Sequence, residues 1–232
     1  MNKTHKGLDR YFYPAMALLV GAIVAYGFSR TAGANLLHPA AARPVILYVH
    51  AAVFSAWVIL FIVQSTLISS GNVRWHRRLG VAGVALGAIM PLLGIATAIV
   101  MGRWRGPQDP ADAAFLGVSF NDMCSFGVAF GLAVYWRRRP EFHKRLMLMA
   151  SCCLTVAAFA RFPATLVHAP WWYAYVDALL LLGVLRDVIV LRRIHPVYLA
   201  GIPCIVAAQL LAMYLFLAAP PTWLSFVALF GK

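Results

Sequence analysis

Seven apolar segments, each long enough to cross a lipid bilayer as a helix, run through most of the chain. They cover residues 12–29, 45–68, 79–101, 115–136, 146–167, 172–191 and 197–218. A helix needs about 20 apolar residues to cross about 30 Å of hydrocarbon, and none of these segments shows the alternation of membrane β-strands. The pattern predicts an all-α fold: a polytopic transmembrane bundle of about seven helices, formed by a single integral membrane domain over residues 1–232.

The composition agrees with a membrane protein and argues against a soluble one. Hydrophobic residues make up 62% of the chain and charged residues only 12%, whereas soluble domains carry about 25% charged residues. The net charge of +13 comes from short basic clusters between the apolar segments, so we expect no nucleic-acid partner. The expected partners are the lipid bilayer and its anionic headgroups. The four cysteines have no CxxC spacing and are expected to be small buried side chains.

The basic residues also predict an orientation. Thirteen of them fall on one side of the expected bundle and five on the other, with the N-terminus on the richer side. The positive-inside rule places the richer side in the cytoplasm, so seven spans would leave the C-terminus outside. We expect a multi-pass protein of the cell inner (cytoplasmic) membrane. The tail over residues 220–232 is too short to span and is expected to lie along the outer surface.

Ionisable residues inside the expected spans define a first candidate site. Such a residue is costly in lipid unless it is paired or lies in a wet cavity. His50, Asp122, Asp177 and Arg161 lie on four different segments, each roughly 8–10 Å below the outer face at 1.5 Å per helical residue; His168 lies slightly above them. Either Arg161 pairs with one of the two carboxylates and locks the bundle, or the group lines a polar pocket.

A second candidate cluster lies at the cytoplasmic face. His76, His143 and His195 each stand beside cations, and Asp187 with Arg186 is close by on the sixth segment. Contact with lipid headgroups and helix termination would explain each histidine alone. Two of the cytoplasmic turns are also similar in sequence, W-H-R-R-L-G at residues 75–80 and F-H-K-R-L-M at residues 142–147. This similarity suggests two related helical hairpins that form a four-helix core.

Paired histidines on neighbouring helices, with cations for the propionates, are typical of b-type haem sites. His50 and His168 are the candidate ligands of an outer haem, and His76 and His143 of an inner one. Two histidine pairs, one towards each face of the membrane, resemble the cytochrome b561 and ferric reductase architecture, in which a four-helix core stacks two haems. The resemblance implies membrane electron transfer, with a quinone or another redox partner. The position of His76 and His143 at helix starts departs from that architecture.

Two other functions stay open, and so does the question whether the protein is an enzyme. A non-haem metal enzyme could use His50, Asp122 and Asp177, with His168 as a further ligand, although no HxxxH, HxxHH or HExxH spacing is present. A transporter, proton path or assembly factor could instead use the ion-pair cluster around Arg161.

The chain also resembles a family of bacterial multi-pass membrane proteins without an assigned activity. The matching stretches are FYPAMALL, GFSRT, HAAVFSAWVILFIVQ, WHRRLGVAG, RRRPEFHKRLMLMA, ARFP and HPVYLAG. They contain His50, His76, His143, Arg161 and His195, whereas His168 lies outside them. The resemblance supports the architecture and implies no activity.

Overall fold

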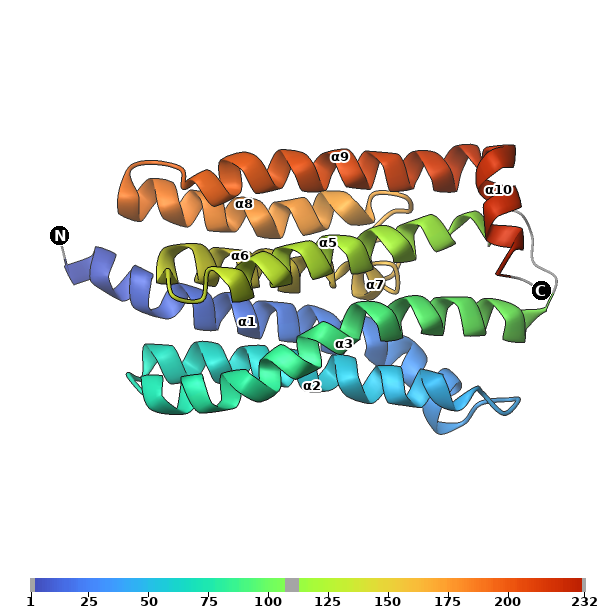
Figure 1. The fold of residues 1–232 in the computed structure, drawn as a ribbon, viewed down its shortest axis with the longest axis horizontal. Coiled ribbons are helices and arrows are strands. Elements are labelled where there is room, and N and C mark those ends of the chain that lie inside the picture. The colour runs from blue at the N-terminus through green and yellow to red at the C-terminus, as the bar shows by residue number, and fades with distance from the viewer. Residues whose placement is uncertain (1–2, 107–112, 231–232) are drawn as a thin grey trace.

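The computed structural model describes residues 3–106 and 113–230, which are helical and contain no strand. The helices are α1 (Lys3–Ala32), continued by the π-helical η1 (Gly33–Leu37), α2 (Val45–Ser69), α3 (Val73–Arg105), α5 (Leu116–Tyr135), α6 (Pro140–Cys153), α7 (Val156–Phe159), α8 (Trp172–Leu191), α9 (Pro196–Ala218) and α10 (Pro221–Ala228). The long helices lie side by side along one axis, as Figure 1 shows. The short α10 lies across one end of the bundle.

Six helical stretches among the described residues are long and apolar enough to cross a membrane. They are Asp9–Leu37, Val45–Ser69, Val73–Arg105, Leu116–Tyr135, Pro140–Phe159 and Pro196–Ala218. Large apolar side chains such as Leu18, Leu92 and Leu210 are exposed on them, as expected when lipid is the solvent. The protein is therefore a multi-pass, all-α membrane protein.

The expected seventh span, residues 172–191, forms α8 with those bounds. It differs from the six because every stretch of 18 residues within it contains three charged residues, Asp177, Arg186 and Asp187, whereas each of the six has an apolar stretch of that length with at most two. Arg186 and Asp187 are buried in the protein. In Figure 1, α8 runs beside α9 through the bundle.

The fifth expected segment, 146–167, is where the sequence prediction departs most from the structure. Its helix starts earlier, at Pro140, because proline is favoured in the first turn. It is interrupted after Cys153, where the Thr155 hydroxyl donates to the Cys152 carbonyl at 2.6 Å and competes with the regular helical bonds. The following α7 ends at Phe159, four residues before Pro163, which cannot continue a helix.

The first and third helices extend well beyond the apolar segments that predicted them, 12–29 and 79–101. The structure gives Lys3–Ala32 and Val73–Arg105. Hydropathy marks only the part of a helix that lies in hydrocarbon, so polar turns at either end are missed. Those polar turns at the start of α3 carry His76 and Arg77.

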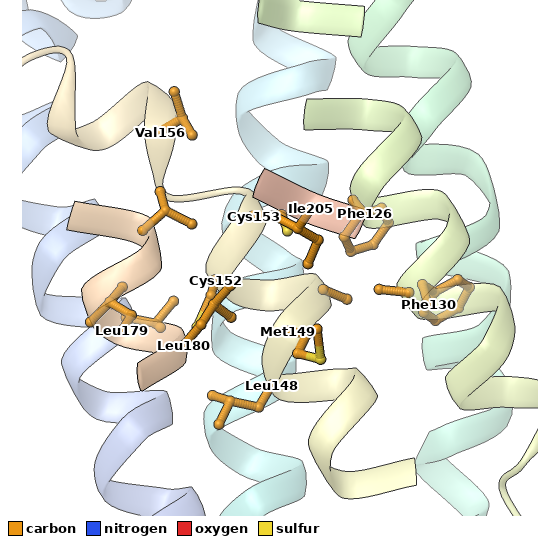
Figure 2. Packing of buried hydrophobic residues seen from close by; sticks show 14 of the residues in the cluster. Phe126, Phe130, Leu148, Met149, Cys152, Cys153, Val156, Leu179, Leu180 and Ile205 are labelled. Carbon is orange, nitrogen blue, oxygen red and sulfur yellow. The ribbon is translucent and has the colours of Figure 1, made fainter. Parts of the chain in front are cut away.

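The core of the bundle lies where α5 and α6 meet their neighbours. Figure 2 shows Phe126 and Phe130 of α5 near Met149 and Cys153 of α6. The two phenyl rings stack with centroids 5.5 Å apart, and Trp57 of α2 contacts both rings edge-on. Aromatic side chains in such pairs stabilise a core beyond their buried area.

Small residues allow close packing of α3 against α2 and α5. A Cβ atom added at Gly83 would lie 3.0 Å from Leu60, and one added at Gly87 would overlap the ring of Phe130. Gly83 and Gly87 thus form a small-residue face that packs inside this chain. By contrast, a Cβ added at Gly131 would meet nothing within 4 Å.

The cysteine prediction is half right. Cys152 and Cys153 are buried in the core, whereas Cys124 and Cys204 are exposed on helix surfaces. All four are free thiols.

Candidate functional site

Two of the predicted histidines, His76 and His143, face each other at one end of the bundle. His76 lies in the first turn of α3 and His143 in the first turn of α6, and both helices start at the end where α1 begins (Figure 1). The ring centroids are 6.3 Å apart and the ring planes meet at 78°. The similar W-H-R-R-L-G and F-H-K-R-L-M turns therefore bring their histidines together.

Each of the two histidines has a ring nitrogen without a hydrogen-bond partner among the described residues: Nε2 in His143 and Nδ1 in His76. The Nδ1 atom of His143 lies 2.9 Å from the carbonyl oxygen of Ala133 on α5. A bond of this kind holds the ring in place and leaves Nε2 for a metal, the usual arrangement of metal-binding histidines. The Nδ1 atom of His76 is buried and has no hydrogen-bond partner among the described residues.

Both histidines line a cavity of about 970 Å³ between α1, α2, α3, α5 and α6. This volume is at the upper end of the range for small-molecule sites, about 300–1,000 Å³. The inner walls are mainly apolar and include Trp57, Leu60, Phe61, Val84, Phe130, Val134 and Met147. Five cations also line it: Arg10, Arg77, Arg137, Arg138 and Lys144.

The types of residue that line this cavity are those that haem sites use: imidazoles, apolar walls and cations. An imidazole nitrogen binds a metal at about 2 Å and lies about 1 Å from the centre of its ring, so two axial imidazoles have centroids about 6 Å apart. The separation of His76 and His143 is 6.3 Å. Apolar walls suit the macrocycle, and the cations suit its propionates.

The predicted outer pair, His50 and His168, is not brought together. His50 of α2 stacks on Phe54 at 4.0 Å, and His168 is exposed in the segment before α8. In Figure 1, α2 and α8 lie on opposite sides of α1 and α6. The described residues therefore offer one facing pair of histidines, at the end of the bundle where α1 begins.

The two intramembrane carboxylates each have neutral hydrogen-bond partners. Asp122 of α5 is buried and accepts from the Tyr173 hydroxyl at 2.9 Å and from Asn121 Nδ2 at 3.4 Å. Asp177 of α8 accepts from Gln209 Nε2 of α9 at 3.1 Å. These bonds join α5, α8 and α9 through polar groups without a cation.

The expected pairing of Arg161 with Asp122 or Asp177 is absent from the described residues. Arg161 follows the end of α7, and its Nε donates to Thr31 Oγ1 of α1 at 3.2 Å. Its guanidinium lies over the Phe28 ring, 4.3 Å from the centroid. The position of a residue along its helix gives its depth in the membrane, but it does not say towards which neighbouring helix the side chain points. The Arg161 side chain points towards α1.

The suggested non-haem metal site is not assembled either. Within the described residues, no three His, Cys, Asp or Glu side chains lie close enough to hold a metal ion together. Asp122 and Asp177 are engaged with neutral donors, while His50 stacks on a phenyl ring.

A buried ion pair joins α6 to α8 beside the cavity. Arg145 and Asp187 form two parallel bonds, Nε to Oδ2 and Nη2 to Oδ1, each 2.7 Å long. Both side chains are fully buried. Arg186 Nη1 donates to Asp187 Oδ1 at 2.6 Å, and Arg186 Nη2 pairs with Asp9 of α1. Arg145 Nη1 reaches Glu141 at 2.8 Å.

Sequence reasoning noted Asp187 and Arg186 but missed the role of Arg145, which it counted only as a loop cation. Two signals were available. Charged residues inside a span commonly pair with one another, so Asp187 called for a search for cations, and Glu141 and Arg145 have the i, i+4 spacing of a helical ion pair. Only the start of α6 at Pro140 places Arg145 inside the helix.

His195, predicted for the cytoplasmic-face cluster, caps α9. Its Nδ1 accepts from the Val197 backbone N–H at 3.2 Å, and its ring meets Phe142 edge-on at 4.8 Å. Burial, together with the positive charge of Arg145, lowers the pKa of His195, so the neutral ring needed for capping is favoured. This geometry agrees with helix termination.

Comparisons with protein-family models, with curated proteins and with solved structures found no match.

Proposed function

We propose that the protein binds one b-type haem between His76 and His143 and serves as a membrane electron-transfer protein. The observation that carries the proposal is the 6.3 Å separation of the two rings on the wall of a cavity of about 970 Å³. A bound haem would supply a one-electron carrier, since its iron alternates between ferric and ferrous states. His76 and His143 would hold its iron.

The remaining cavity residues have complementary tasks in this proposal. The apolar walls at Leu60 and Val84 keep water from the macrocycle. Arg77 and Arg138 have no described carboxylate within ion-pair distance and are free to bind propionates. Lys144 is different, because Glu141 lies 2.9 Å from its Nζ and balances its charge.

We also propose that α8 is a seventh span in the inner membrane, with the N-terminus and the cavity mouth in the cytoplasm. The support is that the 69–73, 135–140 and 191–196 turns lie at the same end as the start of α1 (Figure 1). Thirteen of the twenty Lys and Arg residues lie at this end, in these turns and in the first turns of the helices beside them. Labelling of single cysteines introduced at Ser70 and Ala219 in intact cells tests this. Reagent from outside should reach only position 219, and labelling of position 70 would refute it.

The haem proposal is tested on full-length protein purified in detergent from cells supplied with haem precursor. We expect an absorption spectrum with b-type bands after dithionite and one haem per chain. His76→Ala and His143→Ala should each abolish the bands. His50→Ala is the matched control and should leave them unchanged, because His50 lies outside the cavity.

Three results would contradict the proposal. They are a colourless preparation, a haem content that survives both cavity substitutions, or loss of haem on substitution of His50 alone.

A further inference from the structure

Arg161 is held against the last turns of α1, at the end of the bundle opposite to the haem cavity. The short α7 before it packs closely on α1, since a Cβ atom added at Gly27 would lie 2.5 Å from the Ala158 carbonyl oxygen. The ring of Phe162, which follows Arg161, meets Tyr26 of α1 edge-on at 4.8 Å. These contacts on both sides fix the backbone at Arg161 and so limit where its side chain can lie.

Three of the five N–H donors of the Arg161 guanidinium have no partner among the described residues. Its Nε donates to Thr31 Oγ1 at 3.2 Å, and its Nη1 donates one bond, to the Ala157 carbonyl oxygen. The Phe28 ring covers one face of the guanidinium, with Cζ 4.3 Å from the ring centroid. The remaining donors of Nη1 and Nη2 lie in the guanidinium plane. An arginine that is stacked on an aromatic ring and keeps donors on both amino groups is suited to bind a phosphate or carboxylate group.

The ionisable side chains around Arg161 are also basic. Arg105 at the end of α3 and His50 of α2 both lie within electrostatic range of Arg161; these three residues are called the basic cluster below. The described ion pairs all lie at the other end of the bundle, where α1 begins, and none includes a member of the basic cluster. Because Arg105 and Arg161 repel each other, an anion bound beside them would offset an unfavourable interaction.

The position of Arg161 along the chain shows how an anion could reach it. Arg161 follows the membrane-spanning stretch Pro140–Phe159 by two residues, so it lies at the edge of the hydrocarbon. An anion is too costly to bind in the middle of the bilayer, but at this edge it can come from the water or from a lipid headgroup. Phosphate is the oxyanion that both sources supply.

We infer that Arg161 binds a phosphate group through Nη1 and Nη2 at the basic cluster. The phosphate oxygens accept the donors that the described residues leave unpaired, and the charge of the phosphate offsets those of Arg105 and Arg161. The contacts of α7 with α1 and the stacking on Phe28 hold the guanidinium ready, so little side-chain freedom is lost on binding. The site lies outside the haem cavity and does not depend on the proposed function.

The experiment uses full-length protein in a detergent without phosphate. Binding of inorganic phosphate is measured by equilibrium dialysis, and retention of added phosphatidylglycerol by native mass spectrometry. The wild type should bind about one phosphate group per chain from at least one of these probes. Arg161→Gln should weaken that binding about tenfold or more, as expected for lost hydrogen bonds to a charged group. Haem content of the same samples should stay unchanged.

Two further variants guard the interpretation. Arg103→Gln is the matched control: it removes the same charge at the same end of the bundle, but Arg103 Nε donates to the Phe230 carbonyl oxygen, next to α10. Its phosphate affinity should equal that of the wild type. Arg161→Lys keeps the charge, in case Arg161→Gln does not fold, and should bind phosphate more weakly than the wild type because lysine lacks the planar fork.

The two probes identify the source of the phosphate group. Binding of inorganic phosphate alone supports a site for a soluble anion, and retention of phosphatidylglycerol alone supports a site for a lipid headgroup. Saturable binding of neither probe overturns the inference. Equal loss in Arg161→Gln and Arg103→Gln, or an unchanged affinity in Arg161→Lys, also overturns it, and each of these results leaves the haem proposal standing. Protein without haem that binds phosphate through Arg161 supports this site and refutes the haem.

Discussion

Replacing Asp187 with asparagine should destabilise the protein strongly, because it removes the carboxylate that the buried Arg145 and Arg186 share. The carboxylate accepts two 2.7 Å bonds from Arg145 and one of 2.6 Å from Arg186. Asparagine keeps the shape but has one oxygen and no charge. Arg145 would then depend on Glu141 alone.

The expected cost follows from burial. Removing one partner of a buried ion pair costs about 3–5 kcal/mol, because the remaining charge stays in a medium of low polarity. Glu141 still reaches Arg145 at 2.8 Å, so the lower end, about 3 kcal/mol, is expected. At roughly 2–4 °C per kcal/mol, the Tm should fall by about 6–12 °C.

The assay is thermal unfolding of the detergent-solubilised variants, followed by the helical circular dichroism signal. Glu141→Gln is the surface control: its side chain is 54% exposed, and exposed ion pairs contribute below about 1 kcal/mol. The double variant Arg145→Leu with Asp187→Leu should be more stable than Asp187→Leu alone, because Arg145 is removed together with its partner and Arg186 keeps its pair with Asp9. An Asp187→Asn protein as stable as Glu141→Gln would refute the reasoning.

Two further predictions use the same unfolding assay. Gly87→Ala should cost about 1–3 kcal/mol because its Cβ would overlap the Phe130 ring, whereas Gly131→Ala, which meets open space, should be neutral or slightly stabilising; equal effects would contradict the packing argument. Tyr173→Phe removes a donor to buried Asp122 and should cost about 1–3 kcal/mol, so an unchanged Tm would show that this hydroxyl contributes nothing.

The helices themselves were largely predictable from the sequence. The segments 45–68 and 172–191 match α2 and α8 to within one residue, because hydropathy follows the cost of placing each residue in lipid. The interruption between α6 and α7 was not predicted. It depends on the hydroxyl of Thr155 turning back onto Cys152, a local competition that an average over 18 residues does not detect.

Of the candidate site, only the pairing of two histidines was predictable, because the sequences around them, residues 75–80 and 142–147, are similar to each other. The two similar turns pointed to His76 and His143 as partners, and their ring centroids lie 6.3 Å apart. For Arg161, the depth along the chain was the sole guide. Depth leaves the rotation of each helix undetermined, and the side chain lies over Phe28, apart from both carboxylates.

Three consecutive residues of α6 connect the ion pair to the haem proposal. His143 is bonded to Ala133 of α5, the Lys144 ammonium lies 3.7 Å from Asp9 of α1, and Arg145 binds Asp187 of α8. Successive helical residues point about 100° apart, so one turn fixes α6 against three neighbours and thereby places the His143 ring opposite His76. Loss of the Asp187 carboxylate should therefore loosen this turn and lower haem content at temperatures where the helices remain folded. Haem content in Asp187→Asn that falls only together with the circular dichroism signal would mean that the ion pair stabilises the bundle without positioning His143.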